Sequence, residues 1–182
     1  FNLSNLNWAR SHLDAEKVAQ AVAVLSKARR IEFFGFGASG IVAIDAQQKF
    51  PLFAVPCGAP LDSHRMFMTA EMLGPGDVVV AISNTGQTRE VINATKVARE
   101  KGAEVIAISG HDGPLIRHAT VPLIVETLEN TDLYTPTVSR LSQLVVIDIL
   151  SVAVSLQRGE KHHQRIAEMK SRLANLRVHG TY

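Results

Sequence analysis

Short, uninterrupted apolar runs that alternate with helix-type segments constrain this fold more than any other feature of the chain. The clearest run is Val78-Val79-Val80-Ala81-Ile82, in which no polar residue separates the apolar ones. A strand with one solvated face needs such alternation, whereas a strand of a parallel sheet is covered on both faces and is apolar throughout. The pattern therefore predicts an α/β fold with three layers, in which helices cover both faces of a doubly wound, five-stranded parallel sheet.

The expected elements follow from this alternation of apolar runs and helical periodicity. The predicted strands are residues 31–36, 54–57, 77–83, 104–109 and 121–125, and all five are expected to be buried. The predicted helices are residues 14–28, 39–50, 61–73, 88–101, 136–156 and 160–177, with a short turn at residues 114–118. Asp14 is a plausible N-cap for the first helix, and Gly102 ends the fourth.

Size and charge limit the class of protein. A chain of 182 residues with 46% hydrophobic content predicts a single domain over residues 1–182, with its core at residues 14–158. The net charge of +2 is spread along the chain, so this segment lacks the basic patch of a nucleic-acid-binding domain. The longest apolar run, residues 141–156, is broken by polar residues and is shorter than the ~20 residues that span a bilayer. No membrane contact is expected, and the lone Cys57 suits a buried structural thiol in a reduced, cytoplasmic protein.

A glycine-rich loop, Gly35-Phe36-Gly37-Ala38-Ser39-Gly40, follows the first predicted strand. Its spacing fits a dinucleotide site, where backbone amides approach a phosphate at the start of a helix. A dinucleotide fold also needs an acidic residue for the ribose about 20 residues later. The corresponding strand end here is Pro56-Cys57-Gly58, so a nicotinamide or flavin is disfavoured and no cofactor is expected.

A second loop, Ser83-Asn84-Thr85-Gly86-Gln87-Thr88, also follows a strand and precedes a helix. Its three hydroxyl groups and its backbone amides suit a phosphate dianion, and Gly86 permits the tight turn. The loop contains no lysine, so it gives little support to magnesium-dependent triphosphate hydrolysis. The carboxyl ends of parallel strands share one edge of a sheet, so this loop and Ser39 can face one crevice. The alternative is that both loops contain ordinary helix-capping residues.

These two loops resemble the two signatures of the sugar isomerase (SIS) domain, a family that binds phosphosugars. The segments Leu61-Asp62-Ser63-His64 and Ser139-Arg140-Leu141-Ser142-Gln143-Leu144-Val145-Val146-Ile147-Asp148 are similar to the effector domain of RpiR-type bacterial transcription regulators, especially those of hexose catabolism. The resemblance covers roughly residues 14–158. It implies a homodimeric sensor with an N-terminal helix-turn-helix DNA-binding domain that this chain lacks. It also implies that 2-keto-3-deoxy-6-phosphogluconate releases the regulator from DNA.

Carried over by position, the resemblance implies a phosphate site at the two loops. Its members are the hydroxyls of Ser39, Ser83, Thr85 and Thr88 and the amides of Asn84 and Gly86, with Gly37, Ala38 and Gly40 beside them. Many family members have serine where this chain has Thr85, but the hydroxyl is retained. Arg140 either reads the acid end of a phosphorylated keto acid or forms a salt bridge at the start of its helix.

An isomerase would need a group that moves a proton between adjacent carbons. Asp62 and His64 stand at the start of a helix, where they either cap it or contact the ligand. Glu126 and Glu129 follow the fifth predicted strand and either approach the crevice or are solvated loop carboxylates, and the second interpretation is preferred. No residue is therefore assigned as catalytic, and a ligand-sensing domain is predicted. A phosphosugar isomerase and a sugar-phosphate-binding regulator of another enzyme are the alternatives.

Four further polar residues have structural interpretations. Asp148 lies in the apolar run and is expected to make a hydrogen bond in the core. Lys49 is expected at the surface. The adjacent His162 and His163 cannot both reach one metal ion from a regular helix, so no metal site is predicted.

Overall fold

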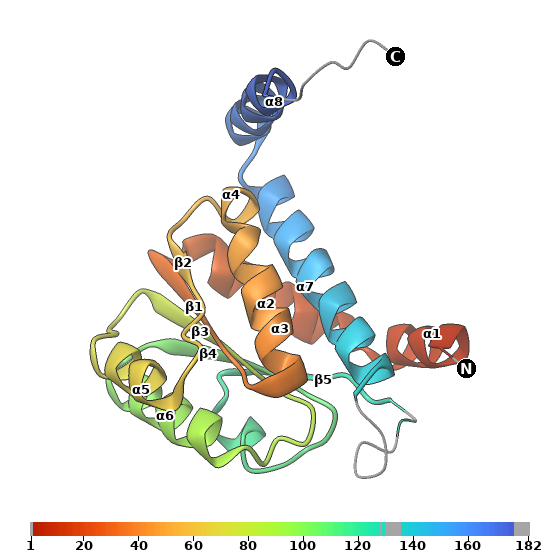
Figure 1. Ribbon diagram of the computed structural model, residues 1–182, viewed down its shortest axis with the longest axis vertical. Helices are drawn as coiled ribbons and strands as arrows, with labels where there is room; N and C mark the ends of the chain where they lie inside the picture. The colour runs from red at the N-terminus through yellow and green to blue at the C-terminus, as the bar shows by residue number, and fades with distance from the viewer. Residues whose placement is uncertain (1, 128, 130–135, 177–182) are drawn as a thin grey trace.

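Five parallel strands form the sheet, in the order β2-β1-β3-β4-β5 (Figure 1). In this computed structural model, which describes residues 2–127, 129 and 136–176, the strands are β1 (Arg30–Phe34), β2 (Cys57–Gly58), β3 (Asp77–Ser83), β4 (Glu104–Ser109) and β5 (Val121–Ile124). The strand order reverses between β1 and β3, so the connections that follow these two strands lead to opposite faces of the sheet. The predicted three-layer, doubly wound α/β class is confirmed.

Helices cover both faces of this sheet (Figure 1). They are α1 (Asn2–His12), α2 (Ala15–Lys27), α3 (Gly37–Gln48), α4 (Phe50–Phe53), α5 (Ser63–Glu71), α6 (Arg89–Glu100), the 3-10 turn η1 (Ile116–His118), α7 (Val138–Gln157) and α8 (Glu160–Ala174). On one face α2, α3 and α7 pack together, and on the other α5 packs against α6. The predicted C-terminal helix matches α8 up to Ala174, and the predicted last residue, Arg177, lies outside the described residues.

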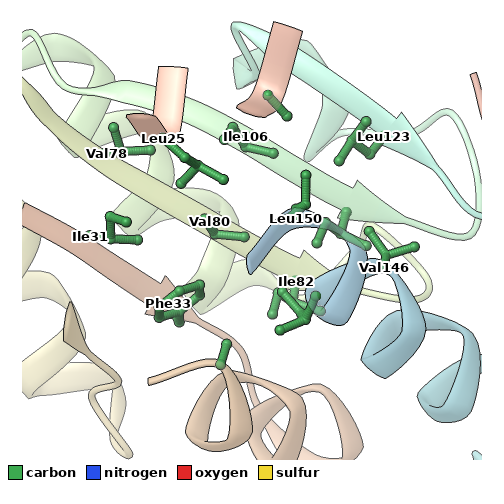
Figure 2. Packing of buried hydrophobic residues seen from close by; sticks show 14 of the residues in the cluster. Leu25, Ile31, Phe33, Val78, Val80, Ile82, Ile106, Leu123, Val146 and Leu150 are labelled. Atoms are coloured by element: carbon green, nitrogen blue, oxygen red, sulfur yellow. The ribbon is translucent and has the colours of Figure 1, made fainter. Parts of the chain in front are cut away.

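The central strand β3 is buried on both faces, which explains why its sequence is apolar throughout. All seven of its residues are buried. Val78, Val80 and Ile82 belong to the core beneath α2, α3 and α7, whereas Val79 and Ala81 belong to the core beneath α5 and α6. Figure 2 shows the first of these cores, in which Leu25 of α2 and Val146 and Leu150 of α7 meet strand side chains. Because successive side chains of a strand point to opposite faces, both faces must be apolar.

The second strand differs most from its prediction. The sequence predicted a buried strand over residues 54–57, but β2 has only two residues, Cys57 and Gly58, and both are half-buried. Ala54 lies in the left-handed region at φ 61° and ends α4, so the chain is still turning where the strand was expected. Pro56 has no N–H to donate to a ladder. The edge strand is therefore short.

Two helices were absent from the predictions, the four-residue α4 and the longer α1. The segment Asn2–His12 forms α1, which packs against α7, and the rings of Trp8 and His12 stack with their centroids 3.9 Å apart. Its apolar residues are few, and Ala9 is the one buried in the core. Its helical periodicity is correspondingly weak, so the sequence carried little signal for it.

The long helix α7 places Asp148 at the surface, so the predicted core hydrogen bond is wrong. Its carboxylate lies 2.7 Å from the ammonium group of Lys49, which also contacts Asp45 at 3.2 Å. Lys49 is thus at the surface but paired, and the hydrogen bond to Asp148 raises the pKa of Lys49 although partial burial opposes this. Helical periodicity explains the position of Asp148, because it lies on the same side of α7 as the exposed Val145 and Val152.

By length and composition α7 is also the one helix, among residues that the structure describes, that could cross a membrane. However, 56% of its apolar stretch is buried inside the fold. That buried side carries polar residues as well, including Ser142 and Ser151. Such burial is typical of the core helix of a globular domain.

Candidate functional site

A pocket of about 200 Å³ lies where the carboxyl ends of β1 and β3 meet the start of α7. It is lined by Phe36, Ala38, Ser39, Ser83, Asn84, Thr85, Thr88, Pro136, Ser139 and Gln143. The two loops singled out in the sequence thus share one pocket, as their positions at neighbouring strand ends predicted. None of the lining residues carries a formal charge, so any anion bound here is held by neutral donors.

The serine- and threonine-rich loop is held by its own hydrogen bonds. The Ser83 and Thr88 hydroxyl oxygens are 3.1 Å apart, and the Gln87 amide donates to Thr85 Oγ1 at 3.2 Å. The Gly86 amide donates to the Ser83 carbonyl at 3.1 Å, and Gly86 has φ 64°. A Cβ at Gly86 would lie 2.9 Å from the Ser109 hydroxyl, so both backbone angle and space require glycine. The Gly86 amide, predicted to bind phosphate, is used inside the loop.

The glycine-rich loop brings the start of α3 to the same pocket. A Cβ at Gly35 would meet the Ser39 carbonyl oxygen at 2.7 Å, and Gly37 has φ 56°. Glycine at these positions lets the strand end pack against the first turn of α3. Ala38 and Ser39 thereby line the pocket, and the buried Ser39 hydroxyl donates to Gln143 Oε1 at 3.3 Å. Gly37 and Gly40 have structural roles and do not line it.

Three helices begin at this pocket, and each directs the positive end of its dipole toward it. Ser39 belongs to the first turn of α3, Thr88 is the N-cap of α6, and Ser139 belongs to the first turn of α7. Among the residues that the structure describes, no side chain caps the first amides of α3 or α6. Uncapped amides at a helix start bind anions well. The pocket is therefore suited to a phosphate group.

The start of α7 is different because Glu129 occupies it. One carboxylate oxygen accepts hydrogen bonds from the Thr137 and Val138 amides at 2.8 and 3.1 Å. The other oxygen accepts from the Ser139 amide at 2.9 Å and from its hydroxyl at 2.7 Å. Burial alone would raise the pKa of Glu129, but the hydrogen bonds from Ser139 and the two other amides outweigh it and lower the pKa. The interpretation of Glu129 as a solvated loop carboxylate is wrong, whereas Glu126 is exposed as expected.

Besides Gly37, Gly40 and Gly86, three predicted ligand contacts, Asp62, His64 and Arg140, lie outside the pocket lining. The Asp62 carboxylate accepts from the Arg65 amide at 2.8 Å and caps α5, which is the structural alternative that the sequence left open. His64 is exposed on α5, and Arg140 is half-buried in the first turn of α7 without lining the pocket. Contact of these three residues with ligand stays a prediction that this structure does not support.

Four lining residues were not predicted. These are Phe36, Pro136, Ser139 and Gln143. Ser139 and Gln143 are four residues apart and therefore lie on one face of α7. The sequence contained that spacing, but only the packing of α7 on α3 shows that this face looks into the pocket.

The chemistry of the remaining candidates is limited. Burial, followed by the negative charge of Glu32, raises the pKa of the Cys57 thiol to about 12. The thiol is therefore unreactive at neutral pH, although Cys57 is half-buried and not fully buried as expected. Within the described part of the chain, no group of three or more His, Cys, Asp or Glu side chains could hold a metal ion.

Comparison with known proteins links this pocket to a family. The family model described as "SIS domain" matches residues 24–153. The "HTH-type transcriptional regulator HexR" of Escherichia coli (strain K12) is 39% identical over 175 residues, which cover 96% of this chain and 61% of that protein. HexR of Pseudomonas aeruginosa is 41% identical over 169 residues, covering 91% of this chain and 59% of that protein. The chain thus spans about three fifths of the length of these relatives.

A solved structure extends the comparison to three dimensions. The Vibrio vulnificus NanR protein, solved in complex with ManNAc-6P, superposes with a TM-score of 0.88. The match covers 97% of this chain and 67% of that one. The two sequences are 22% identical, so the likeness concerns the fold.

Proposed function

This chain belongs to the SIS domain family, and we propose that it is the ligand-sensing part of a HexR-like transcriptional regulator. The observation that carries the proposal is the pocket itself, in which neutral hydroxyl donors and the open starts of α3 and α6 surround one cavity. Such a site favours a phosphate dianion without a competing metal ion. A phosphorylated sugar is the ligand class that fits both this chemistry and the family.

Within the site, the phosphate would lie against the Ser83 to Thr88 loop. Ser83, Thr85 and Thr88 would donate their hydroxyls, and Ser39 would donate from the facing loop. Ser139 and Gln143, on the α7 side, would meet the rest of the ligand. The resemblance to HexR makes 2-keto-3-deoxy-6-phosphogluconate, the phosphorylated keto acid of the Entner–Doudoroff pathway, the proposed effector.

The full regulator would be a cytoplasmic homodimer. Its DNA contacts would come from a helix-turn-helix domain that is not part of this chain, because the HexR relatives are named HTH-type and are longer. Binding of the effector would release the regulator from its operators and so relieve repression of glucose metabolism. The chain would act as a sensor and not as an enzyme.

Calorimetric titration tests the ligand. We expect 2-keto-3-deoxy-6-phosphogluconate to bind more tightly than 6-phosphogluconate and glucose 6-phosphate, with inorganic phosphate binding weakly at the same site. Equal binding of all three sugar phosphates would contradict the proposed HexR-like specificity but would still support a phosphate site. If none of them binds, the proposed sensor function is wrong.

One observation favours a phosphosugar isomerase as the second candidate. Glu129 hydrogen-bonds Ser139, which lines the pocket, so a carboxylate stands close to where a sugar would bind. Proton transfer between carbons needs such a base. However, both of its oxygens already cap α7, and its lowered pKa makes it a weak base. An assay of aldose–ketose phosphate interconversion decides the matter: turnover that disappears in Glu129→Gln would establish the enzyme.

A further inference from the structure

Helix α7 exposes an apolar stripe on its outer side. Val145, Ile149, Val152 and Leu156 are 39–64% exposed, and their spacing of four, three and four residues places them along one face. At a rise of about 1.5 Å per residue, the stripe is roughly 16 Å long. A cavity of about 250 Å³ between α1 and α7 adjoins it, and Val145 and Ile149 belong to its lining. A continuous exposed apolar surface of this kind marks a contact with another macromolecule.

Helix α8 has a matching stripe. Ile166, Met169 and Leu173 of α8, followed by Leu176 two residues beyond its end, repeat at spacings of three, four and three residues, which is the pattern of a helix-pairing seam. Leu173 and Leu176 are 52% and 78% exposed. Figure 1 shows α8 projecting from the end of α7, away from the sheet. The C-terminal part of this stripe is thus left uncovered by its own domain, whereas Ile166 and Met169 are half-buried.

The charges beside the α8 seam are basic. Arg165 and Arg172 flank it on one side and Lys170 on the other, while the acidic Glu160 and Glu168 lie toward the outer face. Two copies of α8 paired with each other would bring these like charges together, which opposes pairing. The seam therefore fits an apolar surface that carries negative charge.

The α7 stripe provides such a surface. At the edge of the stripe next to α3, Asp148 of α7 and Asp45 of α3, together with Lys49, leave one net negative charge, whereas Arg10 lines the cavity at the edge next to α1. The α8 helix of the same chain does not cover this stripe. Gly159 lies between the two helices at φ 78° and ψ −177°, a positive-φ conformation that favours glycine, and it directs α8 past the end of α7. Within one chain, the two complementary stripes are therefore separated.

A third feature lies beside the junction of the two helices. A groove of about 540 Å³ runs between the α4 region and α8, and its lining includes Phe50, Val55, Ile166 and Met169. Phe50 is 54% exposed. The groove continues the α8 seam toward the body of the domain. A helix of another molecule that packs against α8 would therefore also contact α4.

From these features we propose that two copies of this chain exchange their α8 helices, so that α8 of each copy packs across α7 of the other. Exchange of an identical element is a low-cost route to a two-fold dimer, because every contact is made twice. The basic flanks of α8 would approach Asp45 and Asp148 of the second copy. The contact identifies the surface of the proposed homodimer, and it does not involve the residues that line the phosphate pocket.

Two substitutions on opposite sides of the contact test it. Val152→Glu alters the α7 stripe and Leu173→Glu alters the α8 seam; each buries an unpaired charge in the contact. We expect each to weaken dimerisation by about 100-fold or more, as measured by sedimentation equilibrium. Gln164→Glu, which makes the same charge change on the outer face of α8, should leave the dimer intact. Circular dichroism and binding of phosphorylated ligand confirm that the variants remain folded.

Mixing the two variants separates exchange from other dimers. A mixed dimer has one unaltered contact, formed by α8 of the Val152→Glu chain on α7 of the Leu173→Glu chain. We therefore expect an equimolar mixture to form more dimer than either variant alone. If either Leu173→Glu or Val152→Glu leaves dimerisation unchanged, the helix exchange is wrong, but the chain still forms the proposed homodimer through another surface. If the unaltered chain stays monomeric, with α8 folded back on its own α7, both the helix exchange and the homodimer are wrong. The sensor proposal is tested separately, by ligand binding.

Discussion

The two sides of α7 both depart from the usual arrangement of a surface helix, because polar residues share the buried side with core residues such as Val146 and apolar residues are exposed on the other side. Its inner side carries buried polar residues, among them Ser139 and Gln143, whereas its outer side exposes Ile149, Val152 and Leu156. Amphipathic helices at a protein surface normally bury the apolar side and solvate the polar one. Both departures have local reasons: Ser139 and Gln143 on the inner side reach the pocket, and the outer apolar groups fit the second copy of the proposed dimer.

The contrast shows which part of the helix serves which role. At its N-terminal end, α7 contributes neutral donors to a pocket whose other walls come from α3 and the loop after β3. Toward its C-terminal end, α7 contributes an exposed apolar surface to the proposed dimer contact. A substitution at the pocket should therefore leave the outer side of α7 unaffected, and a substitution on the outer side should leave ligand binding unaffected.

The largest effect is expected at the pocket. Ser83→Ala removes a hydroxyl that would donate to the phosphate, so affinity for a phosphorylated ligand should fall by ~1.5–3 kcal/mol, the range for hydrogen bonds to charged groups. Titration calorimetry measures this loss. Ser151→Ala provides the matched control, because Ser151 lies on the inner side of α7, where its hydroxyl bonds the Asp148 carbonyl outside the pocket. Equal losses in the two variants would show that the loss is not specific to a hydroxyl that lines the pocket.

A smaller effect is expected at the start of α7. Glu129→Gln keeps the shape but removes the charge that caps the helix, so the free energy of unfolding should fall by about 1 kcal/mol. The lowered pKa of Glu129 means that its charged form stabilises the native state. This contribution is complete above the usual glutamate pKa of ~4.3 and disappears as the pH falls through the lower, native value.

Urea unfolding at neutral and acidic pH measures both predictions. The difference between the parent chain and Glu129→Gln should shrink as the pH falls below ~4.3. Glu126→Gln is the control, since Glu126 is exposed. A difference that stays constant with pH would show that the charge of Glu129 does not stabilise α7.

The smallest effect is expected on the outer side. Asp148→Asn breaks the ion pair with Lys49, in which the Asp148 side chain is 60% exposed. Exposed pairs contribute ~0.5 kcal/mol or less to stability, so thermal unfolding should hardly change. Affinity for a phosphorylated ligand should be unchanged, because neither residue lines the pocket. A clear loss of ligand affinity would show that the two sides of α7 are coupled.

Local sequence signals predicted the centre of the fold well. Strands β3 and β4 have the predicted bounds, and α6 lies within one residue of its prediction because Thr88 is its N-cap and Lys101 its C-cap. These elements combine strong periodicity with clear boundaries. The short edge strand β2 was overestimated, since a run of apolar residues does not reveal a left-handed turn at Ala54.

The candidate site was predicted in part, and the reason is again physical. Ser39, Ser83, Asn84, Thr85 and Thr88 follow strands in the sequence and do line the pocket. Ser139 and Gln143 come to it from a helix that begins 50 residues after Thr88, at Val138. Glu129 was misinterpreted because a carboxylate in a loop gives no sign of the helix start that it will cap.

Local sequence was enough to establish the class of the fold and the chemistry of the two loops, because burial on both faces and the composition of a turn are local properties. The tertiary structure was needed to show that three helix starts converge on one pocket, that Asp148 faces outward and that two apolar stripes remain uncovered. These features depend on how α3, α7 and α8 are oriented relative to one another. Packing between distant segments sets that orientation, and no single stretch of sequence encodes it.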